Sequence, residues 1–214
     1  MRHLFLLLSS IIFLSNCSQN EPFKKPQTAQ EIKVWSQALN FPKDCDEGSF
    51  EGDENLPNLE FYTLNDSYYV SATCESFAYQ NVVNFYQTDN VGKNIQLMEL
   101  FQVELDLASI NYFDVNDQPL NTPEFEVVFY KSKQIIHQSL QVIDNQLTIL
   151  RSYNDQGSCG TLSTYDLVGN EAKLVKIQLN ADCESETKKP QDQWAYYRFK
   201  CTSEDPRSCR LIKP

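Results

Sequence analysis

From residue 58 onward the chain is a succession of short segments in which apolar and polar residues alternate. A period of two places alternate side chains on opposite faces of a β-strand. Tyr, Val, Ile and Thr are frequent in these segments, as is typical of strands, and turn residues such as Asn65-Asp66-Ser67 and Asp144-Asn145 separate them. The pattern predicts a mainly β fold, an antiparallel meander or sandwich-like sheet, over LEFYTL, YYVSATC, NVVNFYQT, FEVVFYK, QIIHQSLQVI, QLTILRSY, GTLSTYDLV, AKLVKIQL and QWAYYRFK.

The segment LFQVELDLASI, which begins at Leu100, also alternates. A helix over residues 95–105 fits the apolar spacing as well, but we expect a strand. One face would then carry Phe101, Val103, Leu105 and Leu107, and the other Gln102, Glu104 and Asp106. Residues 114–124 are the most loop-like stretch, which either divides the domain into two halves or forms one long connection.

A short helix is expected before the strands. Thr28 and Glu31 fit a capping box, in which each side chain accepts a hydrogen bond from the other residue's backbone N–H. Ile32, Trp35 and Leu39 then recur on one helical face, with Trp35 as a packing residue. The dipeptide at 41–42 ends in proline and stops the helix.

The N-terminus determines where the chain goes. Arg2 precedes an apolar run from Leu4 to Leu14, which is far shorter than the roughly 20 residues of a membrane-spanning helix and is typical of a secretory signal. The run ends in LSNC at Cys17, which resembles the lipobox of bacterial lipoproteins, with Asn16 in place of the usual Gly, Ala or Ser. The resemblance implies a signal peptide at 1–16 and palmitate or other acyl chains on Cys17. The polar residues and two prolines that follow predict a lipid-anchored linker at 17–27, and the strand pattern predicts a β-rich domain at 28–214.

Two or more acyl chains hold a protein stably at a membrane. The expected location is therefore the bacterial cell envelope, on its periplasmic or surface face. Ser18 rather than Asp after the acylated residue favours the outer membrane, by the sorting rule known for such lipoproteins. An ordinary cleaved signal, with Cys17 left as a disulfide partner, is the alternative interpretation.

Six further cysteines remain, and an exported chain allows them to form three disulfides. Six cysteines permit 15 pairings, among which the sequence cannot choose. We expect local pairing of Cys45 with Cys74, Cys159 with Cys183, and Cys201 with Cys209. A zinc site is disfavoured because the chain has no Cys-x-x-Cys and only one histidine, His137, after the signal segment.

Two stretches of the body, LTILRSYNDQGSCGTLSTYDLVGNEAKLVKIQLNADCE at 147–184 and YYVSATCESFAYQNVVNFY at 68–86, are similar to a family of exported bacterial proteins of unknown function. The shared elements are a Cys-Gly turn, a Tyr-bearing strand and a second Cys. The resemblance implies an exported β fold and a disulfide between Cys159 and Cys183. It implies no catalytic residue.

Catalytic and metal-binding patterns are weak. GSCG at 157–160 lacks the second spaced glycine of a nucleophile elbow, and any Ser158 or Cys159 mechanism would have to use His137 as base. We interpret His137 as a solvent-facing or hydrogen-bonded strand residue. The acidic stretches 44–55 and 114–118 lack the glycine of an EF-hand loop, so we interpret both as solvated acidic loops rather than calcium sites. No catalytic residue, metal or cofactor is predicted.

Net charge and aromatic content restrict the kinds of partner that the protein could bind. A net charge of −11 disfavours nucleic acid as a partner, because phosphate neutralisation requires clustered cations. Dense tyrosines indicate a recognition surface or simply sheet packing, and the candidate binding residues are Tyr68, Tyr69, Tyr196 and Tyr197. The sequence favours a noncatalytic envelope module that binds a protein or glycan partner. An envelope hydrolase using paired carboxylates and a structural subunit of an envelope assembly are the alternatives.

Overall fold

The computed structural model describes residues 25–41, 58–64, 67–89, 94–155, 157–184 and 189–212. Cys17, Cys45 and the acidic stretch at 44–55 lie outside these residues. The described elements, in chain order, are α1 Ala29–Ala38, β1 Leu59–Leu64, β2 Ser67–Ser76, β3 Asn81–Asp89, β4 Gln96–Leu97, β5 Leu100–Phe113, β6 Pro119–Ser132, β7 Gln134–His137, β8 Ser139–Ile143, β9 Gln146–Ser152, β10 Gly160–Val168, β11 Glu171–Asn180, the 3-10 turn η1 Gln191–Gln193, β12 Ala195–Cys201, the 3-10 turn η2 Pro206–Ser208 and β13 Cys209–Ile212.

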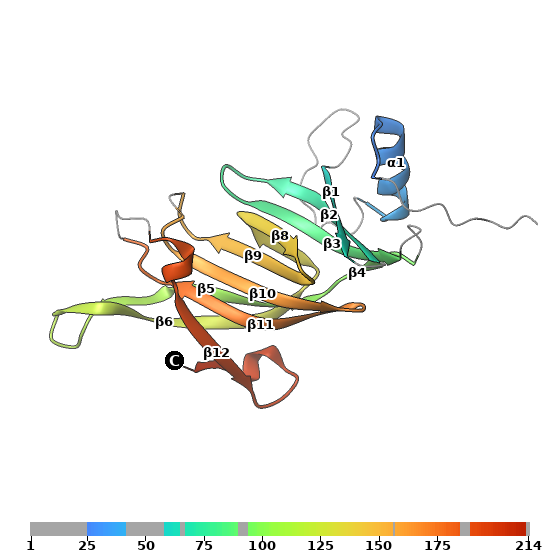
Figure 1. The fold of residues 1–214 in the computed structure, drawn as a ribbon. Coiled ribbons are helices and arrows are strands. Elements are labelled where there is room, and N and C mark those ends of the chain that lie inside the picture. Colours follow the sequence, from blue (N-terminus) through green and yellow to red (C-terminus); the bar gives the residue numbers. More distant parts are fainter. Residues whose placement is uncertain are drawn as a thin grey trace, which may run out of the picture.

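All strand pairs of the described residues are antiparallel, so the predicted mainly β architecture with one N-terminal helix is confirmed. One sheet has the order β1-β2-β3-β4 (Figure 1), and β7 also pairs with β3. A six-stranded sheet has the order β13-β12-β11-β10-β9-β8, and β5 and β6 form a two-stranded hairpin. Most neighbours in the sheets are also neighbours in sequence, as expected of a meander.

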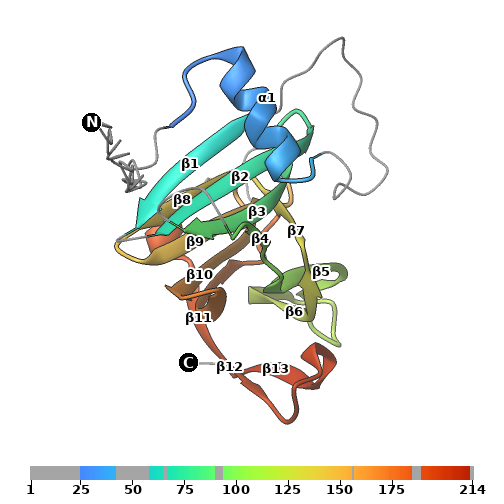
Figure 2. The same ribbon diagram turned by 90° about the vertical axis from the view of Figure 1, so that its right-hand side faces the viewer.

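The main core lies where the inner faces of these sheets meet. Figure 2 shows the β5–β6 hairpin and the strands β8 to β12 arranged around a common interior. The side chains that fill it come from all three sheets, and the largest fully buried ones include Phe85, Leu100, Ile135, Leu147, Tyr165 and Ile177. Burial of apolar area at roughly 25 cal/mol per Å² is the main force that holds the sheets together.

Helix α1 covers the outer face of the first sheet (Figure 2). The predicted capping box is present, with the Thr28 and Glu31 side chains each accepting from the other's backbone N–H. Leu39 is buried against this face, and the Trp35 ring meets Phe61 edge-on at 5.3 Å between centroids. Trp35 is therefore a packing residue, as predicted.

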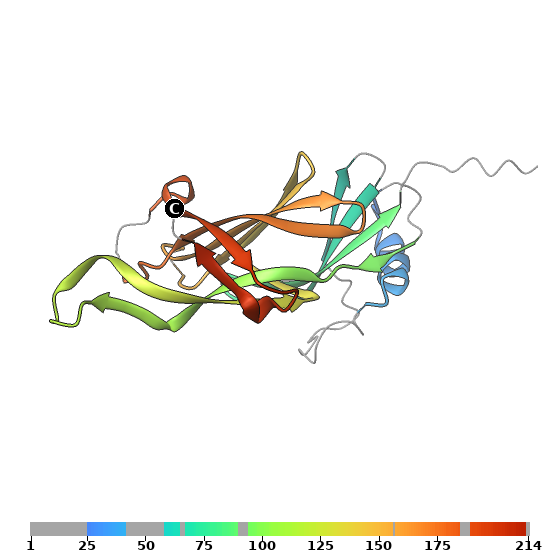
Figure 3. The same ribbon diagram turned by 90° about the horizontal axis from the view of Figure 1, so that it is seen from below.

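The β5–β6 hairpin is the longest element, and Figure 3 shows it reaching past the rest of the molecule at the end opposite α1. The preference for a strand at Leu100 is confirmed. The predicted faces are partly wrong. Gln102 is buried, with its amide donating to the Gln134 carbonyl at 2.8 Å, whereas Leu107 is 49% exposed. Leu107 is exposed because the register shifts after Asp106, beyond which β5 no longer lies over the core.

Residues 114–118 form the turn of this hairpin, while Pro119 already belongs to β6. The turn is built by Asp114, whose carboxylate accepts from the backbone N–H groups of Asn116 at 2.7 Å and Gln118 at 2.9 Å. The loop predicted at 114–124 is therefore shorter than expected, because its second half pairs with β5.

Two of the expected disulfides are present. Cys159 is bonded to Cys183 and Cys201 to Cys209, with sulfur–sulfur distances of 2.08 and 1.94 Å. Cys74 is also disulfide-bonded, while its expected partner Cys45 lies outside the described residues. Disulfides persist in oxidising surroundings, so these bonds point to an exported compartment.

Candidate functional site

The four candidate tyrosines do not form one exposed face. Tyr69 and Tyr197 lie in the main core with 3% and 8% of their surface exposed, and Tyr197 also lines the groove described below. The Tyr69 hydroxyl donates to the Gly169 carbonyl at 3.3 Å. Tyr68 is half-buried on β2 and Tyr196 is exposed on β12, in different sheets. Alternation along each strand sends adjacent tyrosines to opposite faces, which separates Tyr68 from Tyr69 and Tyr196 from Tyr197.

The GSCG turn is closed to substrates. Ser158 is fully buried, and its hydroxyl accepts from the Asn154 amide at 2.6 Å. Cys159 is held in its disulfide with Cys183. A network of buried polar groups thus shapes this turn, and neither side chain is available as a nucleophile.

The environment of His137 also differs from the solvent-facing or hydrogen-bonded one that the sequence predicted. It is 7% exposed, and neither ring nitrogen has a hydrogen-bond partner among the described residues. It lies on the core face of β7 beside Ile135, because the two residues are two positions apart on one strand. Burial lowers the pKa of the imidazole, against a smaller opposing effect of the Glu60 carboxylate.

No group of three or more His, Cys, Asp or Glu side chains within the described ranges could hold a metal ion. In the same ranges no helix combines the length and apolarity needed to cross a membrane. The stretch 114–118 forms the Asp114-centred turn described above, whereas 44–55 lies outside the described residues.

A groove of about 1310 Å³ runs between β6 and the C-terminal hairpin β12–β13. One wall is the continuous stretch Pro123–Phe129 of β6. The opposite wall is Pro206 and Arg207 of η2 with Cys209–Leu211 of β13. Since successive residues of a strand point to opposite faces, a lining made of consecutive residues means that the groove follows the strand edges.

The floor of the groove is aromatic and apolar. The Phe125 ring meets Tyr197 edge-on at 5.7 Å between centroids, and Phe129 packs on Phe199 at 5.9 Å. Leu211 of β13 adds an aliphatic surface beside them. These contacts also dock the C-terminal hairpin onto the β5–β6 hairpin, so the floor is part of the main core.

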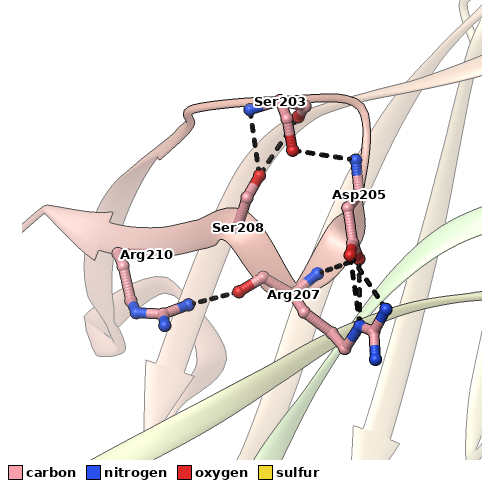
Figure 4. Close-up of polar contacts among 5 residues, drawn as sticks. All are labelled: Ser203, Asp205, Arg207, Ser208 and Arg210. Atoms are coloured by element: carbon pink, nitrogen blue, oxygen red, sulfur yellow. Dashed lines mark hydrogen bonds and ion pairs between the residues drawn. The ribbon is translucent and has the colours of Figure 1, made fainter.

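The turn between β12 and β13 shapes the basic wall (Figure 4). The Asp205 carboxylate caps η2 by accepting from the Arg207 backbone N–H at 2.9 Å, and it pairs with the Arg207 guanidinium at 3.0 Å. Hydrogen bonds from the Arg207 side chain and backbone lower the pKa of Asp205. The Arg210 guanidinium donates to the Arg207 and Cys209 carbonyls at 2.7 and 2.6 Å, and it makes no ion pair with a described residue.

The acidic wall is on β6. Glu124 and Glu126 are exposed on one face, and Phe125 and Phe129 point from the other. Neither glutamate pairs with a cation of the described residues, and Glu126 lies directly opposite Asp106 on β5. The groove thus has acids on one wall and arginines on the other.

The sequence predictions missed this groove. Its walls are more than 70 positions apart in the chain, and the turn CTSEDPRSC was interpreted only as a disulfide loop. The one local signal was the acid–apolar alternation from Glu124 to Val127. That signal marks a strand with one exposed face, but it does not identify the strand as a sheet edge.

Comparison with known proteins adds no assignment: no protein-family model matches the chain, and no curated protein or solved structure gives a significant match.

Proposed function

We propose that the protein is a lipid-anchored module of the bacterial cell envelope that binds a protein partner in the groove between β6 and the C-terminal hairpin. It performs no catalysis. Its anchor is the acylated Cys17, and the partner is bound through apolar contacts on the floor and charged contacts on the two walls. Acyl chains rather than charge hold it at the membrane, because a chain of net charge −11 is repelled by anionic lipid.

One observation carries the binding role: the groove joins an aromatic floor to walls of opposite charge. Aromatic side chains and arginine are the residues that contribute most to protein recognition. Its volume of about 1310 Å³ exceeds the 300–1,000 Å³ range of common small-molecule sites.

The hydrolase alternative is less well supported. It needs two carboxylates that face each other across the bound substrate. Both glutamates of the groove, Glu124 and Glu126, are on β6, and the opposite wall offers Arg207 and Arg210. This arrangement suits recognition better than acid–base chemistry.

Site-specific photo-crosslinking in the producing cells tests the binding role. A crosslinking amino acid replaces Val128, which lines the groove and is 49% exposed. The matched control replaces Val168, which is 68% exposed on β10 and away from the groove. We expect a discrete protein adduct from position 128 alone. Equal adducts from both positions, or none from position 128, would overturn the assignment of the groove.

A further inference from the structure

The β6 wall presents an unpaired strand edge. Within the described part of the chain β6 pairs only with β5, and β13 is the last strand of its sheet. The Glu126 N–H is directed toward β5, where it donates to the Ser109 hydroxyl at 2.7 Å. Alternate residues of a strand direct their main-chain groups to opposite edges, so Phe125, Val127 and Phe129 direct theirs into the groove.

The dimensions of the groove fit an extended chain. The seven residues Pro123–Phe129 form one wall, a length of about 23 Å at roughly 3.3 Å per residue. A strand lying along this wall would have one row of side chains over the half-buried Phe125 and Leu211, and the other row toward solvent. The inner row meets apolar surface, and the outer row lies beside Glu124 and Glu126.

The carboxylates of the β6 wall favour basic side chains in the outer row of an incoming strand. Opposite charges on neighbouring strands stabilise the pair, and like charges destabilise it. Neither Glu124 nor Glu126 forms an ion pair with a described residue, and Asp106 opposite Glu126 adds to the local negative charge. Lysine or arginine in the outer row of an incoming strand would supply the missing counter-charge.

We propose that the groove receives an extended segment of the partner protein, which adds a strand to the free edge of β6 with apolar side chains inward and basic side chains outward. This inference rests on the proposed protein-binding function and specifies its mode. Main-chain hydrogen bonds to Phe125, Val127 and Phe129 provide affinity, and the alternating side chains provide specificity.

Synthetic peptides test the mode directly. The probe is a fluorescent nine-residue peptide of alternating Val and Lys, titrated against the full chain by fluorescence anisotropy. A peptide with the same residues in two blocks should bind at least tenfold more weakly. N-methylation of every second residue removes donors from one edge, so only one of the two methylation registers should weaken binding, again by at least tenfold. Strand addition would be overturned if the two-block peptide bound as tightly as the alternating peptide, or if N-methylation left binding unchanged in both registers.

A charge exchange tests the selection of basic residues. The double variant Glu124→Lys/Glu126→Lys should bind the Val–Lys peptide at least tenfold more weakly and should gain affinity for a Val–Glu peptide. The control Glu99→Lys/Glu171→Lys makes the same change in net charge at exposed positions outside the groove, and it should leave both affinities within about twofold. An equal effect of the two variants would show that only net charge matters and would overturn the proposed register.

The two proposals fail in different ways. If position 128 yields a protein adduct in cells while the peptides show none of these preferences, strand addition is wrong and the binding function stands. If position 128 yields no adduct, the binding function itself is wrong.

Discussion

His137 links the stability of the fold to pH. Its imidazole lies on the core face of β7 without a hydrogen-bond partner among the described residues. Burial favours the neutral form and lowers the pKa. The unfolded chain protonates the same residue near its ordinary pKa of about 6.5. Between these two values the unfolded state binds more protons, so acidification favours unfolding.

We therefore expect the free energy of unfolding to hold its full value above about pH 6.5 and to fall as the pH drops below it. The variant His137→Leu removes this titration and fits an apolar site. Urea unfolding of both proteins at pH 7.5 and pH 5.5 measures the difference. Acidification should destabilise the native protein more than the variant, and equal losses would contradict the burial of a neutral imidazole.

Gly160 allows β9 and β10 to approach closely. A Cβ at this position would lie 2.1 Å from the Arg151 carbonyl oxygen, which is backbone and cannot move aside alone. We expect Gly160→Ala to lower the free energy of unfolding by about 2–3 kcal/mol, through strain in the strand pair. Gly169→Ala is the control: its φ of +57° costs an alanine about 1 kcal/mol, and no atom lies within 4 Å of the added Cβ. Denaturant unfolding should rank Gly160→Ala as the more damaging change.

At the scale of elements, the C-terminal hairpin depends on its disulfide. Cys201 and Cys209 face each other across β12 and β13, with a sequence separation of 8. A loop of this length is stabilised by roughly 2.5 kcal/mol when cross-linked, and the separation of 24 between Cys159 and Cys183 gives roughly 3.5 kcal/mol. The first bond holds a wall of the groove, and the second joins the segment before β10 to the segment after β11.

The two bonds should therefore have separable effects. Cys201→Ala/Cys209→Ala should accelerate amide hydrogen exchange in residues 198–212 and lower the affinity of the protein for the Val–Lys peptide. Cys159→Ala/Cys183→Ala should lower the global free energy of unfolding more, while peptide affinity changes less. Hydrogen exchange and anisotropy on the two variants check this, and a reversed order of affinities would contradict the placement of the groove.

Much of the architecture at this scale follows from local sequence. Period-two alternation identified most strands, and Thr28 with Glu31 identified the start of α1. The errors arose where pairing partners decide burial. Leu107 is exposed because β5 leaves the core after Asp106, and Gln102 is buried because its amide has a carbonyl to bind. The groove could not be predicted because its walls meet only through tertiary packing, which alternation within one strand does not encode.

At the scale of the whole molecule, the proposed anchor and the proposed binding site lie in different parts of the chain. The expected anchor is Cys17, and the groove lies between β6 and β13. Cys17→Ala should release the protein from membranes into the soluble fraction without altering peptide affinity. Intact-mass measurement of the membrane-extracted protein should give residues 17–214 with attached acyl chains, and reduction should add two hydrogen masses for each disulfide. A variant that still sediments with membranes would contradict acylation as the anchor.

The opposite placement of α1 and the β5–β6 hairpin sets how far the molecule can reach. The described chain begins beside α1, while the hairpin turn with Phe113 and the fully exposed Val115 lies at the far end (Figures 1 and 3). The linker at 17–27 would span at most about 36–40 Å if it were fully extended. If Cys17 is acylated, the length of the linker and the long axis of the body together set the distance of the groove from the membrane. A shorter linker would then exclude distant partners and leave every contact in the groove intact.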